Sequence, residues 1–218
     1  MVQIEVAGQA LVLLPERAAY LPAWRTLLVA DAHLGKAQSF RSLGVPVPAG
    51  TTSQTLEALD AAIAATGAER IVFLGDLIHS SRSRTPGTAQ AVARWRARHP
   101  GLALTLVRGN HDRHAGDPPP DWGIDCVDGP LHFGTLALAH EPEPLAGHYV
   151  IGGHLHPAAS LGGPAHDRLR LPCFHFGPEV GVLPAFGAFT GCATVERRPG
   201  DRTWVVVDDS LRPLHSVP

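Results

Sequence analysis

Five short polar motifs each follow a short apolar run, and this repeated placement constrains the fold more than any other feature. The runs cover residues 26–30, 70–74, 102–107, 136–139 and 149–151. The motifs are D-x-H at 31–33, G-D at 75–76, G-N-H-D at 109–112, a histidine at 140 and G-H-x-H at 153–156. Compact apolar runs that stop at such residues are typical of buried strands. Because ligands of open α/β sheets bind beyond the carboxyl ends of strands, we expect the motifs to converge.

The side chains in these motifs suit divalent metal ions. Carboxylate, imidazole and amide groups bind manganese, iron or zinc, and the absence of a thiolate disfavours a structural zinc site. Two ions about 3.5–4 Å apart can clamp a phosphate and hold a hydroxide as the nucleophile. Such a pair needs a carboxylate that bridges both ions, and Asp76 is the isolated candidate. The sequence therefore predicts two divalent ions, with Mn²⁺ expected first and Fe, Zn or Mg as alternatives.

The remaining pattern predicts an α/β front half and a mostly β second half. Residues 51–66 form a predicted helix, because Leu56, Leu59 and Ile63 share one face and Gly67 can end it. A second helix is predicted over 88–98. After residue 115 the apolar runs are strand-like, including 169–174 and 204–207, and Gly and Pro separate them. Motifs lie on both sides of the proline-rich loop at 117–121, so we expect one domain over residues 1–218.

Composition excludes several classes of protein. The 18 basic and 20 acidic side chains give a net charge of −2, which does not by itself indicate a nucleic-acid binder. The three cysteines are widely spaced, so we expect no disulfide framework. We expect instead that the protein works in a reducing compartment. The sequence shows no signal-peptide pattern and no apolar stretch long enough to cross a bilayer. We therefore expect a cytoplasmic protein without a membrane partner.

In this order, the five motifs resemble the calcineurin-like metallophosphoesterase family over residues 31–156. The resemblance implies an α/β fold, a four-layer metallophosphoesterase β-sandwich flanked by helices, and a metal-dependent phosphoesterase. It implies that His111 lies over the substrate phosphate and that Asp112 orients its ring. His79 stands where many relatives have an acid, so its role stays open between substrate binding and none. The implied ligands of one metal are Asp31, His33, Asp76 and His156, and those of the other are Asp76, Asn110, His140 and His154.

Three further segments, at residues 29–36, 107–113 and 171–174, are similar to one bacterial branch of this family. This is the ligase-associated DNA damage response endonuclease (PdeM) branch. The similarity implies a phosphodiesterase that acts on DNA, as an endonuclease in DNA repair. It also implies an ATP-dependent DNA ligase, a helicase and an exonuclease as functional associates. Whether the chain forms a homo-oligomer, and whether it acts as an endonuclease or an exonuclease, stays open.

Arginines are concentrated between Leu77 and Gly116, where Asp112 is the one acid. Because the guanidinium fork matches phosphate, this segment predicts a basic rim near the metals. An ordinary solvated surface is the equally weighted alternative. The arginines are Arg82, Arg84, Arg94, Arg96, Arg98, Arg108 and Arg113, of which Arg82, Arg84, Arg108 and Arg113 are predicted to bind substrate.

Other residues receive structural interpretations. Trp95 and Cys173 are predicted to be core residues. The remaining histidines receive no functional role: His99, His114, His132, His148, His166, His175 and His215.

Three other functions use the same kind of fold. A small-molecule phosphodiesterase or phosphomonoesterase with a nucleotide substrate would need the same metals and a different pocket. A nucleotide-lipid pyrophosphatase would need an apolar cap, for which the interval between Asp112 and His140 leaves little room. A non-catalytic scaffold would have a degenerate site, whereas here all expected ligands and His111 are present.

Overall fold

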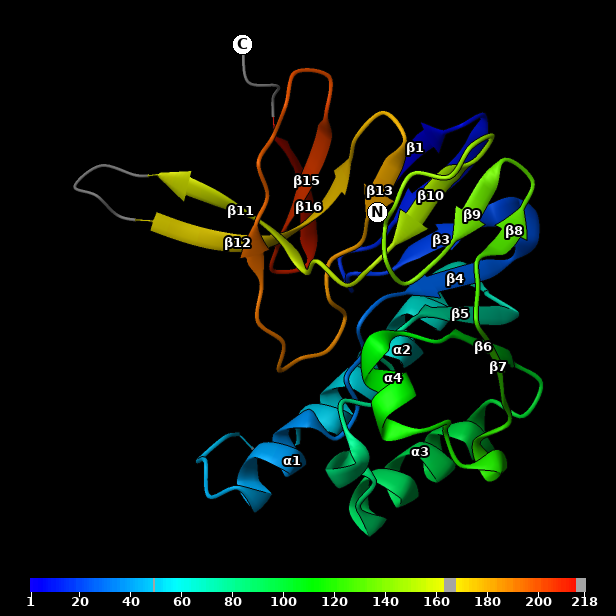
Figure 1. Ribbon diagram of the computed structural model, residues 1–218, viewed down its shortest axis with the longest axis vertical. Coiled ribbons are helices and arrows are strands. Elements are labelled where there is room, and N and C mark those ends of the chain that lie inside the picture. The colour runs from blue at the N-terminus through cyan, green and yellow to red at the C-terminus, as the bar shows by residue number, and fades with distance from the viewer. Residues whose placement is uncertain (49, 163–167, 215–218) are drawn as a thin grey trace.

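The computed structural model describes residues 1–48, 50–162 and 168–214, and two β-sheets pack face to face in it (Figure 1). His166 and His215 lie outside the described residues. The first sheet has seven strands in chain order: β1 (Val2–Val6), β2 (Gln9–Leu13), β3 (Ala19–Leu21), β4 (Thr26–Val29), β5 (Arg70–Leu74), β6 (Ala103–Val107) and β7 (Ile124–Val127). Strands β1 to β4 are antiparallel, whereas β4 to β7 run parallel, so the carboxyl ends of β4, β5 and β6 lie at one edge.

The second sheet contains nine strands in the order β14-β11-β12-β13-β10-β9-β8, with β15 paired to β12 and β16 to β15. Strands β9 and β10 are parallel, so the residues that follow them also leave the sheet at one edge. The strands are β8 (Leu131–Phe133), β9 (Leu136–Leu138), β10 (Tyr149–Gly152), β11 (Pro157–Gly162), β12 (Arg168–Phe176), β13 (Val180–Val182), β14 (Ala193–Thr194), β15 (Arg202–Val207) and β16 (Ser210–Leu214).

The helices belong to the first half of the chain and lie against the first sheet (Figure 1). They are α1 (Lys36–Ser42), α2 (Thr51–Thr66), α3 (Pro86–Arg98) and α4 (Asn110–Ala115), with short 3₁₀ turns η1 (Pro22–Trp24), η2 (Ser81–Ser83) and η3 (Pro120–Trp122). Helix α3 begins where the Thr85 hydroxyl accepts a hydrogen bond from the Thr88 amide, with Pro86 in the first turn. Helix α2 ends at Gly67, whose left-handed conformation closes the last turn.

Strand β5 shows how one sheet separates two cores. Its side chains alternate, so that Ile71 and Phe73 pack toward α2 and α3 while Val72 and Leu74 pack between the sheets. A strand buried on both faces reads as a continuous apolar run, as residues 70–74 do. The core beneath the helices includes Trp95, which confirms its structural interpretation.

The predicted α/β class and the two helices are confirmed, and α3 begins two residues before the predicted start. Several elements were missed. Helix α1 is too short to reveal a helical period, and α4 consists mainly of polar motif residues. Cys173 is buried in β12, as expected. Among the described residues, no helix has the length and apolar character needed to cross a membrane.

Candidate active site

The backbone turns sharply at the ends of the motif-bearing strands. Five predicted metal ligands have a positive φ, a region that L-residues seldom adopt. Such a conformation costs about 1–3 kcal/mol and persists only where the surrounding structure holds it, which is characteristic of functional sites. The five residues are Asp31 (φ 52°), His33 (45°), Asp76 (52°), His154 (64°) and His156 (45°).

Glycines in the same motifs permit close approach between the turns. A Cβ atom on Gly75 would come within 3.0 Å of the His140 ring, and one on Gly109 would meet the Asp76 carboxylate equally closely. The side chains of His140 and Asp76 are buried, so neither can move aside to make room for an added Cβ. The glycines of G-D and G-N-H-D therefore serve the packing of one motif against the next.

Asp31, His33 and His156 form the first group of candidate ligands, with ligand atoms within 4.8 Å of one another. His156 Nε2 lies 3.4 Å from Asp31 Oδ1. Both of these atoms, and both ring nitrogens of His33, are buried without a hydrogen-bond partner. Buried polar atoms are normally paired, so this cluster has the character of a metal site. Burial, followed by nearby cations, holds the pKa of His33 well below its usual range, which favours the neutral imidazole that metals bind.

Asp76, His140 and His154 form the second group, and Asn110 joins them. His140 Nε2 lies 3.0 Å from Asn110 Oδ1, 3.1 Å from His154 Nδ1 and 3.5 Å from Asp76 Oδ1. The other nitrogen, His140 Nδ1, lies 3.0 Å from the Leu74 carbonyl oxygen and donates to it. This hydrogen bond leaves Nε2 with its lone pair directed at the group, as a metal ligand requires.

Asp76 lies between the two groups. Its Oδ2 is 4.0 Å from His33 Nε2 and its Oδ1 is 3.5 Å from His140 Nε2, so each oxygen faces one group. Burial is the largest influence on this carboxyl and raises its pKa. Bound dications would act in the opposite direction by stabilising the carboxylate. The geometry therefore suits the bridging position.

His111 belongs to neither group, and its ring lies beside Asp76 and His33. Its Nε2 lies 3.9 Å from Asp76 Oδ2, and the side chain is partly exposed. Its Nδ1 donates to the carbonyl oxygen of His79 at 2.8 Å. The two rings stack with centroids 4.8 Å apart, and both rings lie edge-on to that of His33. Both the ring and the carbonyl of His79 therefore lie at the candidate site, and a role of His79 in substrate binding stays a prediction.

Asp112 contacts backbone amides, whereas the resemblance implied that it orients the ring of His111. Its buried carboxylate accepts three backbone hydrogen bonds, from Asp76 N (2.7 Å), Gly109 N (2.9 Å) and Ile78 N (3.2 Å). The first and third donors lie after β5, and the second lies after β6. The carboxylate therefore joins two motif-bearing turns, and the His79 carbonyl orients the His111 ring instead.

The predicted basic rim is thinner than the local sequence suggests. Arg108 forms a two-pronged pair with Asp117 at 2.7 and 2.8 Å and a contact with Asp128 at 3.3 Å. Arg84 donates to the backbone carbonyls of Gly116 and Asp117. Both guanidinium groups are therefore engaged within the protein.

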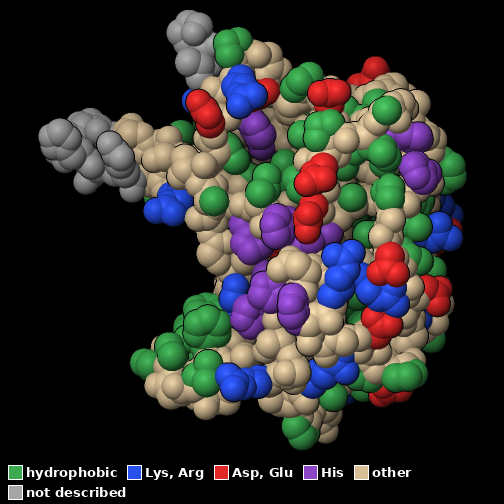
Figure 2. Space-filling model, in the orientation of Figure 1, with side chains coloured by type: hydrophobic (Ala, Val, Ile, Leu, Met, Phe, Trp, Pro, Cys, Tyr) green, Lys and Arg blue, Asp and Glu red, His purple; other side chains and the backbone are tan. Residues whose placement is uncertain are grey.

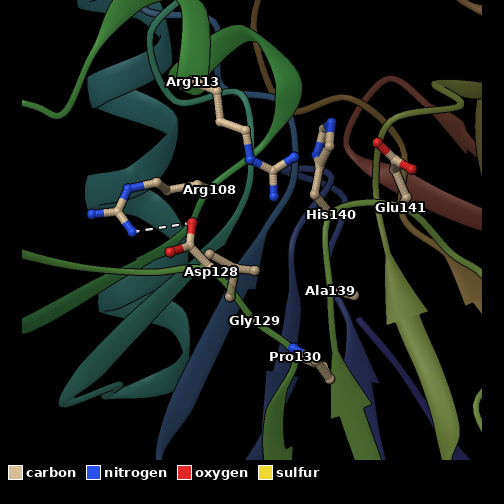
Figure 3. Close-up of a pocket in the computed structure, with 9 residues that line it drawn as sticks. Arg108, Arg113, Asp128, Gly129, Pro130, Ala139, His140 and Glu141 are labelled. Atoms are coloured by element: carbon tan, nitrogen blue, oxygen red, sulfur yellow. Dashed lines mark ion pairs between the residues drawn. The ribbon is translucent and has the colours of Figure 1, made fainter.

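Arg113 and Arg82 remain exposed, and the described residues offer neither an ion pair. Arg113 lines a pocket of about 190 Å³ that also contains Arg108, His140 and Glu141. In Figure 3 its guanidinium lies on the side of the pocket that faces His140, whereas Arg108 turns toward Asp128. Arg113 is therefore the predicted substrate-binding arginine that the structure places beside a candidate metal ligand.

Lys36 is a charged neighbour of the site to which the sequence interpretation assigned no role. It begins α1 and lines a recess together with His33. Burial lowers the pKa of its ammonium group, while the carboxylates of Asp31 and Asp76 act in the opposite direction. Its place three residues after the D-x-H motif was the available signal. In Figure 2 one group of histidines gathers at the base of an indentation between the β11–β12 arm and the α1 side of the molecule.

Comparisons with known proteins found a family and a solved structure to which this chain is similar. A model of the calcineurin-like phosphoesterase family matches residues 25–177. The crystal structure of Pseudomonas putida nuclease MPE is similar at 44% identity, with a TM-score of 0.87 over 98% of this chain and 99% of that one. The phosphoesterase Yfce from E. coli is more distant, at 16% identity and a TM-score of 0.43 over 87% of this chain and 97% of that one. No curated protein sequence matches the chain.

Proposed function

This chain belongs to the calcineurin-like phosphoesterase family, a family of phosphoester hydrolases, and from that premise we propose that it is a metal-dependent DNA endonuclease. The observation that carries the proposal is the position of Asp76, with one carboxylate oxygen toward each ligand group and with His111 Nε2 3.9 Å from Oδ2. The similarity to the Pseudomonas putida nuclease supports a nucleic acid as the substrate. Ligands come from both sheets, so we treat residues 1–218 as one domain.

The donor set fits two divalent ions. The buried atoms of Asp31, His33 and His156 that have no hydrogen-bond partner would hold one ion, with Asp76 shared. Asn110, His140 and His154 would hold the other. When bound, such ions supply Lewis-acid activation of the phosphate and of the attacking water. Manganese suits this mixed oxygen and nitrogen set, and iron, zinc and magnesium are the alternatives.

His111 acts on the leaving group. Since its Nδ1 hydrogen is directed at the His79 carbonyl, Nε2 carries a proton only when the ring is an imidazolium. That Nε2 proton faces the site and is transferred to the departing oxygen of the scissile phosphodiester. The His79 carbonyl stabilises the charged ring before the transfer and keeps its orientation afterwards. Lys36 and Arg113 add positive charge on either side, where a substrate phosphate gains from it.

The cellular setting follows from the resemblance to the ligase-associated branch. We propose a cytoplasmic role in DNA repair, together with an ATP-dependent DNA ligase, a helicase and an exonuclease.

A small-molecule phosphodiesterase or phosphomonoesterase with a nucleotide substrate is the second candidate. This candidate is favoured by the partners of two arginines, since Arg108 pairs with Asp117 and Arg84 donates to the Gly116 carbonyl. Two of the four arginines predicted to bind substrate are therefore engaged within the protein and less available to a long polyanion. The two candidates differ in the contacts that the protein must make with the substrate on either side of the reacting phosphate. A DNA strand needs contacts on both sides of the cleaved bond, whereas a nucleotide needs one closed pocket.

A substrate panel separates the candidates. Purified protein, stripped by a chelator and reloaded with manganese, is offered plasmid DNA, single-stranded DNA, cyclic nucleotides and monoesters. We expect nicked plasmid and internally cleaved strands, and no activity before the metal is restored. Asp76→Asn serves as the inactive control on every substrate. Hydrolysis of cyclic nucleotides or monoesters with the DNA left intact would refute the DNA assignment.

A further inference from the structure

A second recess opens beside the candidate metal centre, and no function discussed so far uses it. It has a volume of about 450 Å³, which is within the range of small-ligand sites. One cation and two aromatic rings dominate its lining, and no acidic side chain is among the described residues that form it. The lining residues are Lys36, Phe40, Ala188, Phe189, Thr190 and Gly191.

Aromatic rings connect this recess with the metal ligands. The ring of His79 lies 5.3 Å from that of His33 and 6.0 Å from that of Phe40. Phe40 in turn meets Phe189 edge to face, with centroids 5.8 Å apart and an interplanar angle of 83°. The Phe40–Phe189 pair is therefore two ring contacts from a candidate metal ligand, and both phenylalanines are partly exposed.

The segment that carries Phe189 is fixed to the backbone of the site. Phe186 N donates to the Ala30 carbonyl at 2.8 Å, and Gly187 N donates to the Asp31 carbonyl at 3.2 Å. Ala188 N then donates to the hydroxyl of Thr55 on α2 at 3.3 Å. Asp31, a candidate metal ligand, thus also holds the segment that leads to the recess. The recess therefore has a fixed position relative to the candidate metal centre.

We propose that the Phe40–Phe189 recess binds a nucleobase next to the cleaved phosphate. The inference rests on the proposed function and assigns it a base-binding subsite. Every base has a π-face, so stacking on an aromatic side chain holds a nucleotide with little dependence on sequence. Lys36 lines both this recess and the one that contains His33, so its ammonium group lies where the phosphate between base and metals passes.

The charge of Lys36 decides between a nucleotide and an apolar protein segment. An apolar segment would cover this ammonium group without offering an anion, and burying an unpaired charge is costly. A nucleotide brings its own phosphate. The absence of an acid from the described lining also leaves no repulsion against that phosphate.

The test uses oligothymidylate strands from which one base, at one position, has been removed. In the wild-type protein with manganese, cleavage at one of the two phosphodiesters flanking the abasic position should fall about tenfold, since the base there can no longer stack. Phe40→Leu keeps an apolar side chain without a π-face, so its cleavage of complete and abasic strands should be equal. Phe40→Trp should restore the difference. Leu43→Ala is the matched control, because Leu43 is an exposed apolar residue directly after α1, and it should behave as wild type.

The outcomes separate this inference from the proposed function. Cleavage of complete strands with no effect of the missing base would overturn the recess assignment and leave the nuclease assignment intact. A wild-type protein that cleaves no DNA would refute the nuclease assignment and the base site with it. If Phe40→Leu became a smaller species in size-exclusion chromatography while keeping the base effect, a second copy of the chain would be the occupant.

Discussion

Replacing Asp112 distinguishes two accounts of this residue. The resemblance makes it an orienting group for the His111 ring, whereas the structure makes it an acceptor for three backbone amides. Under the first account Asp112→Asn lowers turnover alone. Under the second it lowers the free energy of unfolding, because it disturbs two strand-end turns at once.

The magnitude follows from the hydrogen bonds. Asp112 Oδ2 accepts from Asp76 N and Gly109 N, and Oδ1 accepts from Ile78 N. An asparagine can keep the first two with its carbonyl oxygen, but then it turns its amide donor toward the third N–H. Leaving one buried donor unsatisfied costs about 1–3 kcal/mol. Asp112→Ala leaves all three unsatisfied, so it should cost about 3–6 kcal/mol after allowance for relaxation and water entry.

Urea unfolding of the metal-free protein measures these changes. A chelator removes the stabilisation that bound ions would add, so the midpoint reports the protein alone. Asp125→Asn changes an exposed carboxylate nearby and should leave the midpoint where it is. An Asp112→Asn protein that unfolds at the wild-type urea concentration, but turns over slowly with full metal content, would refute the structural role, in which the carboxylate joins two turns. It would restore the role of orienting the His111 ring.

Three other changes, with two arginine variants for comparison, test the remaining assignments. Asp76→Asn should reduce bound metal from about two ions per chain to well below one, because both ligand groups share this residue, and elemental analysis would measure the loss. His111→Ala should keep its metal and lose about 10²–10⁴-fold in turnover, and loss of metal instead would make it a ligand. Arg113→Ala should flatten the salt dependence of DNA affinity by about one unit, whereas exposed Arg94→Ala on α3 should not. An unchanged Arg113→Ala slope would exclude a phosphate contact, and Arg84→Ala should lower thermal stability rather than this slope.

The position of the ligands could be predicted from sequence because it depends on local signals. Each motif directly follows an apolar run, and parallel pairing of β4, β5 and β6 places their ends at one edge. The same holds for β9 and β10 in the second sheet. The convergence also needs adjacent strands, and here β5 lies between β4 and β6, which brings Asp31, Asp76 and Asn110 close together.

The acidic partners of Arg108 lie just beyond the arginine-rich segment. Between Leu77 and Gly116 the one acid is Asp112, yet Arg108 pairs with Asp117, nine residues along the chain, and contacts Asp128. A charge count that stops at Gly116 leaves both acids out. Charge balance in a folded protein depends on neighbours in space, so the local excess of arginine overstated the basic rim.

The contacts of Asp112 were not predicted for a related reason. In G-N-H-D the acid is adjacent to His111 along the chain, and adjacency suggests contact. At the start of α4, however, the Asp112 side chain turns back to the amide of Gly109, as acids in a first helical turn commonly do. The carboxylate then also reaches the amides that follow β5. Helical geometry, rather than sequence neighbourhood, decides its partners.

Candidate metal ligands with a positive φ come from both sheets and meet at one site. In both D-x-H and H-x-H the first and third residues have positive φ, so the same backbone turn presents a pair of ligands from each sheet. Asp31 joins the two turns, since its Oδ2 accepts from His154 N at 2.9 Å while its Oδ1 is free for metal. The His33 amide is held in turn by the Asp76 carbonyl at 2.9 Å. Hydrogen bonds between protein groups thus hold these left-handed residues in place, and they bring candidate ligands from both sheets together at one site.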